Sequence, residues 1–137
     1  MRAALLTGLE TFEIRDVPAP AIRTDTDVLL RIEQVGVCGS DIHYYRTGRI
    51  GSQVVDFPAA LGHECSAVVA DAGDAVSRVR PGQRVVVDPL VACGRCDQCR
   101  AGRRHLCRDQ SFLGCPGQLG GAVVEQRVLP EACGFVV

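Results

Sequence analysis

The chain carries at positions 28–35 the stretch Val28-Leu29-Leu30-Arg31-Ile32-Glu33-Gln34-Val35, in which aliphatic residues give way to alternating polar and apolar ones. This pattern predicts a β-strand that buries one face. Similar runs predict three further strands, at Cys65–Ala70, Arg84–Val87 and Ala122–Leu129, the last of them stopped by Pro130. Strands therefore account for most of the apolar patterning in this sequence.

Helical periodicity is weak, and two short helices are expected, at 40–47 and 96–102. The strands are separated by turn signals such as Arg80-Pro81-Gly82-Gln83, where proline restricts φ and glycine accepts a positive φ. Many short strands joined by such turns predict a mainly β domain, either a small barrel or a sandwich.

Composition limits the functions that the chain can have. Its 137 residues, 47% hydrophobic and 23% charged, predict a single globular domain, residues 1–137. A net charge of -1 argues against a nucleic-acid partner or an anionic membrane surface. We find neither an apolar run of ~18 residues nor a signal peptide, so a cytoplasmic location is expected. The chain has no lysine, which excludes lysine Schiff-base chemistry, and no G-x-G pair, so it has no dinucleotide-binding fingerprint.

Four cysteines form the strongest motif, C-x2-C-x2-C-x7-C, made by Cys93, Cys96, Cys99 and Cys107. Eight cysteines without an export signal indicate a reducing compartment, where clustered thiols bind metal rather than pair as disulfides. Four sulfurs complete a tetrahedral structural zinc site with no open position. An iron–sulfur cluster is the alternative, although its cysteine runs have a tighter spacing before the fourth residue. We therefore predict a zinc-binding lobe at about residues 89–110.

A second candidate site combines Cys38, His63 and Glu64. Each residue lies at the expected end of a strand, in the segments Gly36-Val37-Cys38 and Gly62-His63-Glu64. The glycine in each segment has no side chain, so the backbone can approach a site closely there. One thiolate, one imidazole and one carboxylate leave a coordination position open, which a catalytic zinc needs for water or substrate. From the residues alone, a cysteine in the core and a histidine at the surface remain the alternative.

These motifs resemble those of the medium-chain zinc-dependent dehydrogenases, and they follow one another along the chain in the same order as in that family. The string Gly36-Val37-Cys38-Gly39-Ser40-Asp41-Ile42-His43 is similar to their first catalytic-zinc segment, and Gly62-His63-Glu64 to their second. The four-cysteine loop resembles their structural-zinc lobe, and the stretch from Tyr44 to Gly51 is most similar to the sorbitol and xylitol dehydrogenase branch. The resemblance implies a GroES-like β-barrel catalytic domain, with the NAD(P)-binding Rossmann domain of the family absent from this chain.

The resemblance also implies roles for single residues. Cys38, His63 and Glu64 hold a catalytic zinc, with Glu64 as a ligand or a close neighbour of one, and the zinc alkoxide of the substrate passes hydride to the nicotinamide. Ser40 relays the proton and His43 passes it toward solvent. From spacing alone, Ser40 is equally an N-cap of the short helix that follows.

Three residues are candidates for the substrate pocket: Tyr44, Arg49 and Phe112. The alternative for Phe112 is a place in the core. The remaining cysteines, Cys65, Cys115 and Cys133, are expected to be small buried apolar residues.

The leading interpretation is the zinc- and substrate-binding domain of an NAD(P)-dependent polyol or secondary alcohol dehydrogenase. Its partners are the alcohol substrate, a Rossmann domain and, in the full-length enzyme, further copies in a homo-oligomer. The chain by itself is expected to be inactive. Two alternatives stay open: a threonine or other alcohol dehydrogenase of the same superfamily, and a non-catalytic zinc-binding β module for protein contacts.

Overall fold

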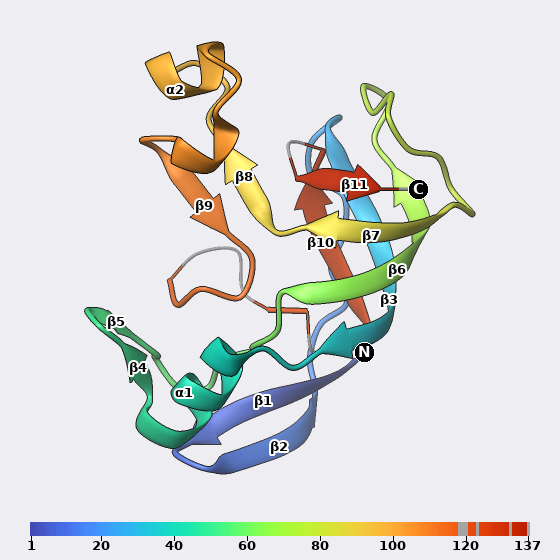
Figure 1. The fold of residues 1–137 in the computed structure, drawn as a ribbon. Coiled ribbons are helices and arrows are strands. Elements are labelled where there is room, and N and C mark those ends of the chain that lie inside the picture. The colour runs from blue at the N-terminus through green and yellow to red at the C-terminus, as the bar shows by residue number, and fades with distance from the viewer. Residues whose placement is uncertain (118–120, 123, 132, 137) are drawn as a thin grey trace.

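The fold is described by a computed structural model for residues 1–117, 121–122, 124–131 and 133–136. The strands and helices occur in this order: β1 (Arg2–Gly8), β2 (Thr11–Asp16), β3 (Asp27–Gly36), α1 (Gly39–Thr47), β4 (Arg49–Ile50), β5 (Gln53–Val54), β6 (Glu64–Ala72), β7 (Arg84–Asp88), β8 (Leu90–Ala92), α2 (Asp97–Arg100), the 3-10 helix η1 (Arg104–Leu106), β9 (Gln110–Phe112), β10 (Gln126–Pro130) and β11 (Gly134–Val136). Strands dominate, as the sequence predicts (Figure 1). No helix in these ranges is long and apolar enough to cross a bilayer.

The centre of the molecule is a five-stranded antiparallel sheet in the order β10-β3-β6-β7-β11. Burial alternates along β6 and β7 of this sheet; on β7, for example, Val85 and Val87 are buried while Val86 faces solvent. The inward side chains, among them Val28, Leu30 and Val69, form the main core. Each buried valine or leucine contributes ~1.5–3 kcal/mol relative to an exposed one, so this core stabilises the sheet.

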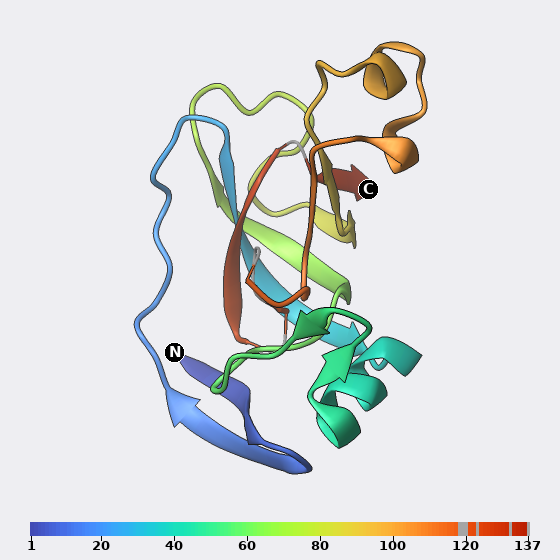
Figure 2. The ribbon, with the colours of Figure 1, turned by 90° about the vertical axis from the view of Figure 1, so that its left-hand side faces the viewer.

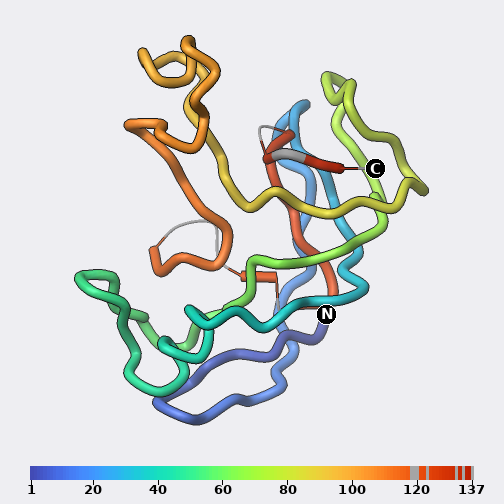
Figure 3. The backbone as a smooth tube through the Cα atoms, in the orientation of Figure 1, coloured from blue at the N-terminus to red at the C-terminus, as the bar shows by residue number. Residues whose placement is uncertain are grey.

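Smaller elements surround the sheet (Figure 2). The β1–β2 hairpin and α1 enclose a second core of Leu6, Tyr44, Val55 and Leu61. The short pair β8–β9 leads into the lobe with α2 and η1, which projects away from the sheet (Figure 3). The register of β3 against β6 shifts twice, which bends β3 and carries its end toward α1.

The predicted strands at 28–35, 65–70 and 84–87 are confirmed, and each is longer than expected by one or more residues. The expected strand at Ala122–Leu129 is shorter, since β10 begins at Gln126, Val124 makes only an isolated bridge with Ala3, and residue 123 lies outside the described residues. Pro130 is the last residue of β10, which is an edge strand of the sheet, where a missing N–H is tolerated. Both expected helices are present, although α2 is shorter than the predicted 96–102, and Gly82 has the positive φ of 88° that its turn requires.

Candidate metal centres

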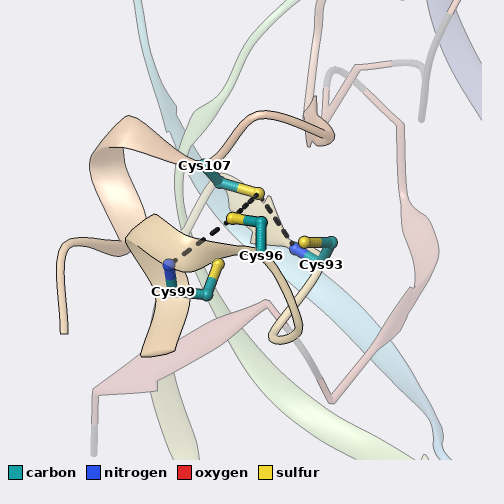
Figure 4. Close-up of side chains that lie close together, drawn as sticks. All are labelled: Cys93, Cys96, Cys99 and Cys107. Carbon is teal, nitrogen blue, oxygen red and sulfur yellow. Dashed lines mark hydrogen bonds between the residues drawn. The ribbon is translucent and has the colours of Figure 1, made fainter. Parts of the chain in front are cut away.

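The four-cysteine centre is built within one lobe (Figure 4). The Sγ atoms of Cys93, Cys96, Cys99 and Cys107 all lie within 4.8 Å of one another. The Sγ atoms of Cys96 and Cys107 are 4.0 Å apart, and zinc–sulfur bonds of ~2.3 Å in a tetrahedron place sulfurs about 3.8 Å apart. The described residues form no disulfide here. The donor set therefore fits a closed, tetrahedral zinc site.

Backbone N–H groups point at the sulfurs of this centre. The N–H of Cys93 donates to Cys107 Sγ at 3.3 Å, and that of Cys99 donates to Cys96 Sγ at 3.5 Å. The backbone N–H of Arg108 is the main cause that lowers the pKa of Cys96 to about 6. Burial and the neighbouring sulfurs raise the pKa of Cys99 to about 12. A bound dication removes this conflict, because it stabilises all four thiolates together.

Two arginines of the lobe form ion pairs with nearby carboxylates. Arg108 Nε lies 2.6 Å from Asp97 Oδ1, and Arg95 lies 3.2 Å from Asp109. The Arg108 guanidinium is the main reason that the pKa of Asp97 falls to about 2. His105 lies on the exposed surface of η1, and the four sulfurs complete the donor set without it.

The second centre joins residues from distant parts of the chain. Cys38 is the N-cap of α1, and Glu64 is the first residue of β6, directly after His63. One ligand atom from each of Cys38, His63 and Glu64 lies within 4.8 Å of the others. Neighbouring residues on a regular strand face opposite ways, but His63 precedes the strand and follows Gly62, whose φ is 86°. This bend lets both side chains approach one ion, and the donor set fits a zinc with an open position.

Asp41 connects the two ligand segments of the second centre. Its carboxylate is buried, and it accepts hydrogen bonds from Cys38 N at 2.9 Å and from Gly62 N at 3.1 Å. The same carboxylate lies 3.8 Å from His63 Nδ1. A carboxylate beside a metal-binding histidine orients its ring. The sequence does not indicate this role, because it marks Asp41 only as an acid in the first turn of a helix.

Two glycines beside the second centre allow neighbouring groups to approach the backbone closely. A Cβ atom on Gly36 would meet Glu64 Oε2 at 2.7 Å, and a Cβ atom on Gly114 would meet Gly62 O at 2.8 Å. Both glycines therefore admit the second centre because they lack a side chain. The loop that follows β9 therefore lies close against the segment that carries His63.

A pocket of about 600 Å³ opens beside His63 and Glu64, and Phe112 lines it. The ring centroids of Phe112 and His63 are 5.6 Å apart. Tyr44 is buried in the second core, where its hydroxyl donates to Gln53 Oε1 at 2.9 Å. Arg49 donates to the carbonyl of Gly51 within the β4–β5 hairpin. The structure thus brings Phe112 to the second centre, while the substrate roles of Tyr44 and Arg49 stay predictions.

Ser40 and His43 lie three residues apart on α1, so they share one face of the helix. Ser40 is half-buried and His43 is exposed. The alternative role of Ser40 as an N-cap is wrong, because α1 begins at Gly39 and Cys38 is its N-cap. The helix starts earlier than expected since Asp41 holds the N–H of Cys38.

The remaining cysteines do not join either centre. Cys65 and Cys133 are buried, as expected, whereas the expectation for Cys115 is wrong, because this residue lies after the end of β9 and its side chain is only half-buried. Burial raises the pKa of Cys65 to about 11 and that of Cys133 to about 12. These thiols therefore stay protonated near neutral pH and behave as apolar core residues.

Comparison with known proteins supplies the family. Residues 24–137 match the alcohol dehydrogenase GroES-like domain. The chain belongs to this family. It is 45% identical over 125 residues to a sorbitol dehydrogenase of Bacillus subtilis, a match that covers 91% of this chain and 35% of that protein. It is 40% identical over 127 residues to a probable D-xylulose reductase A of Aspergillus clavatus, covering 93% of this chain and 35% of that one.

Solved structures agree with this assignment. An alcohol dehydrogenase, TADH, from Thermus sp. ATN1 superposes with a TM-score of 0.82 and 34% identity, over 95% of this chain and 37% of its own. A galactitol-1-phosphate dehydrogenase of Escherichia coli, at 24% identity, shares the fold with a TM-score of 0.87, over 100% of this chain and 38% of its own. The resemblance to the GroES-like domain of medium-chain zinc alcohol and polyol dehydrogenases is therefore confirmed. The chain spans about a third of the length of the curated relatives it matches.

Proposed function

We propose that this chain is the zinc- and substrate-binding domain of an NAD(P)-dependent dehydrogenase that oxidises a polyol or a secondary alcohol to a ketone. The observation that carries the proposal is the convergence of Cys38, His63 and Glu64, tied together by buried Asp41 and open to the pocket lined by Phe112. A purely structural module needs only the four-cysteine centre, so the second centre favours an enzyme.

The chain's own residues have separate tasks in this reaction. Cys38, His63 and Glu64 would hold the ion, which would supply Lewis acidity that lowers the pKa of a neighbouring hydroxyl. The Asp41 carboxylate lies 3.8 Å from His63 Nδ1, so it is the group that would orient the His63 ring as a ligand. Phe112 forms an apolar wall that helps to exclude water from the pocket.

A proton released in the pocket needs a route to solvent, and α1 offers one. In this relay, the half-buried Ser40 hydroxyl accepts the proton as it gives up its own, and the exposed ring of His43 on the same helix takes up the proton that Ser40 releases. Their i, i+3 spacing supports this order. The relatives named sorbitol dehydrogenase and D-xylulose reductase support a polyol as the substrate class.

The first test counts zinc in the purified chain by elemental analysis. We expect about two zinc ions per chain, because both donor sets converge within the described residues. A single zinc that survives His63→Ala means that the second centre needs more protein than this chain has. Zero zinc in the unmodified chain contradicts the proposal.

The second test measures activity in a chimera in which this chain replaces the matching third of the Bacillus subtilis sorbitol dehydrogenase. We expect the chimera to oxidise sorbitol or xylitol with NAD⁺, and His63→Ala to abolish turnover. The chain alone is expected to show no turnover, since it has no dinucleotide-binding fingerprint. A zinc-loaded, folded chimera that oxidises neither polyol rules out the polyol assignment.

A further inference from the structure

An arginine of β10 lies on the core face of the central sheet. Arg127 pairs with Leu30 on β3, and residues directly opposite each other in an antiparallel pair share a face of the sheet. Leu30 is buried in the main core, and so is Leu129, which lies two residues further along β10 on the same face. The alternation that buries these leucines therefore directs the half-buried Arg127 side chain inward.

The charge of Arg127 has no counterion within the described residues. None of them forms an ion pair or a hydrogen bond with its side chain, and its Nε atom is buried. The acids that flank β10 have other partners: Glu125 lies 2.7 Å from Arg2, and Glu131 accepts hydrogen bonds from backbone N–H groups of the loop after β6. The positions outside the described residues, 118–120, 123, 132 and 137, carry no acidic side chain in the sequence. Because a guanidinium stays charged in proteins, the core face of β10 carries an unpaired positive charge.

A pocket of about 300 Å³ opens beside Arg127. Its other walls come from two loops, one within residues 55–61 and one at residues 114–117, and several of their residues are alanines or glycines. Figures 1 and 2 place the second of these loops between β10 and the β4–β5 hairpin. The pocket shares no lining residue with the pocket beside His63 and Glu64, so it is a separate site.

The polar groups of this pocket favour an anion. The planar fork of Arg127 can donate two parallel hydrogen bonds to a carboxylate or a phosphate group. Burial raises the pKa of the Cys115 thiol, which therefore lines the pocket as a neutral, weak donor near pH 7. Asp56 also lines the pocket, but its side chain is exposed and forms no ion pair with Arg127 in the structure. A partly buried cation attracts an anion more strongly than a surface arginine does, because water screens it less.

We propose that Arg127 and the pocket beside it bind a small oxyanion, which is a phosphate or a carboxylate group carried by a small molecule. The pocket is concave and is built from three segments of this one domain, which suits a small ligand better than a protein surface. The proposal is independent of the proposed function, because none of the lining residues belongs to either metal centre.

The test measures phosphate binding by the zinc-loaded chain at constant ionic strength. We expect about 10 mM phosphate to raise the melting temperature by about 2 °C or more relative to chloride, because a ligand that binds only the folded state stabilises it. The Nε–Hε resonance of Arg127 in a ¹⁵N NMR titration is expected to shift with the same midpoint. Acetate is the second probe: a response to phosphate alone identifies a phosphate ligand, and a response to both probes shows that carboxylates are also accepted.

Arg127→Leu is the decisive variant, because leucine suits the core face of a strand. We expect it to melt no lower than the unmodified chain without phosphate, since an unpaired buried charge costs free energy, and to lose the response to phosphate. Arg80→Leu is the matched control, because Arg80 is exposed in the turn before β7, and it is expected to keep the full response. Asp56→Asn is expected to bind phosphate several-fold more tightly, because the carboxylate repels an anion in the same pocket.

Four outcomes overturn the proposal. A full response to phosphate in Arg127→Leu places the anion elsewhere, for example on the zinc of the second centre. Equal loss of the response in Arg80→Leu indicates a general effect of charge. A melting temperature several degrees lower in Asp56→Asn, measured without phosphate, identifies Asp56 as the counterion of Arg127. In the chimera described above, an Arg127 resonance that no longer responds to phosphate assigns the site to a carboxylate from the rest of the enzyme.

Discussion

The two candidate metal centres are assembled in different ways. The four-cysteine centre lies within one continuous segment, from Cys93 to Cys107, whose turns bring the sulfurs together. The second centre takes Cys38 from the start of α1 and His63 and Glu64 from the start of β6, and buried Asp41 joins the two segments. A local centre depends on spacing within the chain, whereas the second depends on the whole sheet being folded.

The largest effect is expected from Cys107→Ala. Cys107 is buried, and its Sγ accepts hydrogen bonds from the backbone N–H groups of Cys93 and Asp109. Zinc binding in such lobes is coupled to folding with apparent free energies of ~10–16 kcal/mol in isolated peptides. We therefore expect the lobe to lose its zinc and its order, while the central sheet stays folded. Elemental analysis and hydrogen exchange measure both changes.

Cys115→Ala is the control for that substitution, because Cys115 lies outside both centres. It is expected to leave the zinc content unchanged. Retention of the full zinc content in Cys107→Ala removes Cys107 from the donor set. Loss of both zinc ions shows that the two centres are coupled and not independent.

The difference between the centres explains how far the sequence could predict them. The spacing of the four cysteines indicates a closed metal site directly, because nothing outside the segment is needed. For the second centre, the residues alone leave a core cysteine and a surface histidine as a serious alternative. The role of Asp41 as a positioning residue cannot be predicted from the sequence, because its hydrogen bond with Gly62 N forms only when α1 packs beside the segment that leads into β6.

Prediction of the fold from the sequence is limited in the same way, because contacts between distant segments cannot be read from local patterns. Strands of the central sheet were predictable where burial imposes alternation, as in β3 and β7. The β1–β2 hairpin was not predicted, because every residue of β2 is exposed and the pattern there carries no periodic signal. Its turn contains Glu10 at a φ of 56°, a conformation that no glycine marks in the sequence. The long-range contacts of this hairpin, such as Leu6 with Ala59, decide its position.

An intermediate effect is expected from Asp41→Asn, which acts on the second centre alone. The amide keeps the size of the side chain but loses the charge beside His63 and one of two equivalent acceptors. Changes to such supporting groups typically weaken metal affinity by roughly 10–100-fold. Competition with a chelator of known affinity measures this, and the zinc of the four-cysteine centre serves as the internal control. Equal weakening of both zinc ions indicates general destabilisation.

A smaller effect is expected from Gly36→Ala. The added Cβ meets Glu64 Oε2 at 2.7 Å, so the carboxylate has to move away from its place in the second centre. We expect a several-fold loss of zinc affinity at this centre, because the carboxylate ends a flexible side chain and can adjust. Gly39→Ala is the matched control, since open space surrounds Gly39. Equal affinity in the two variants means that Glu64 is not a ligand in this chain.

The smallest effect is expected from Arg108→Gln in the four-cysteine lobe. The guanidinium lowers the pKa of Asp97 to about 2, so the substitution is expected to raise this pKa toward 3.8. Gln98 still donates to Asp97 Oδ2 at 3.0 Å, which keeps the shift incomplete. A lowered carboxylate pKa stabilises the folded state above the unfolded pKa, and this contribution disappears as the pH falls through about 2.

Zinc binding in Arg108→Gln is expected to persist, because the backbone N–H that stabilises the Cys96 thiolate is unchanged by a side-chain substitution. An NMR titration of the Asp97 carboxyl, with Arg95→Gln as the control at the other ion pair of the lobe, separates the two arginines. If Arg108→Gln also loses zinc, then the arginine side chain supports the thiolates directly. In that case the four-cysteine centre depends on charges around the cysteines as well as on their spacing. Both centres would then need supporting side chains beyond their metal ligands.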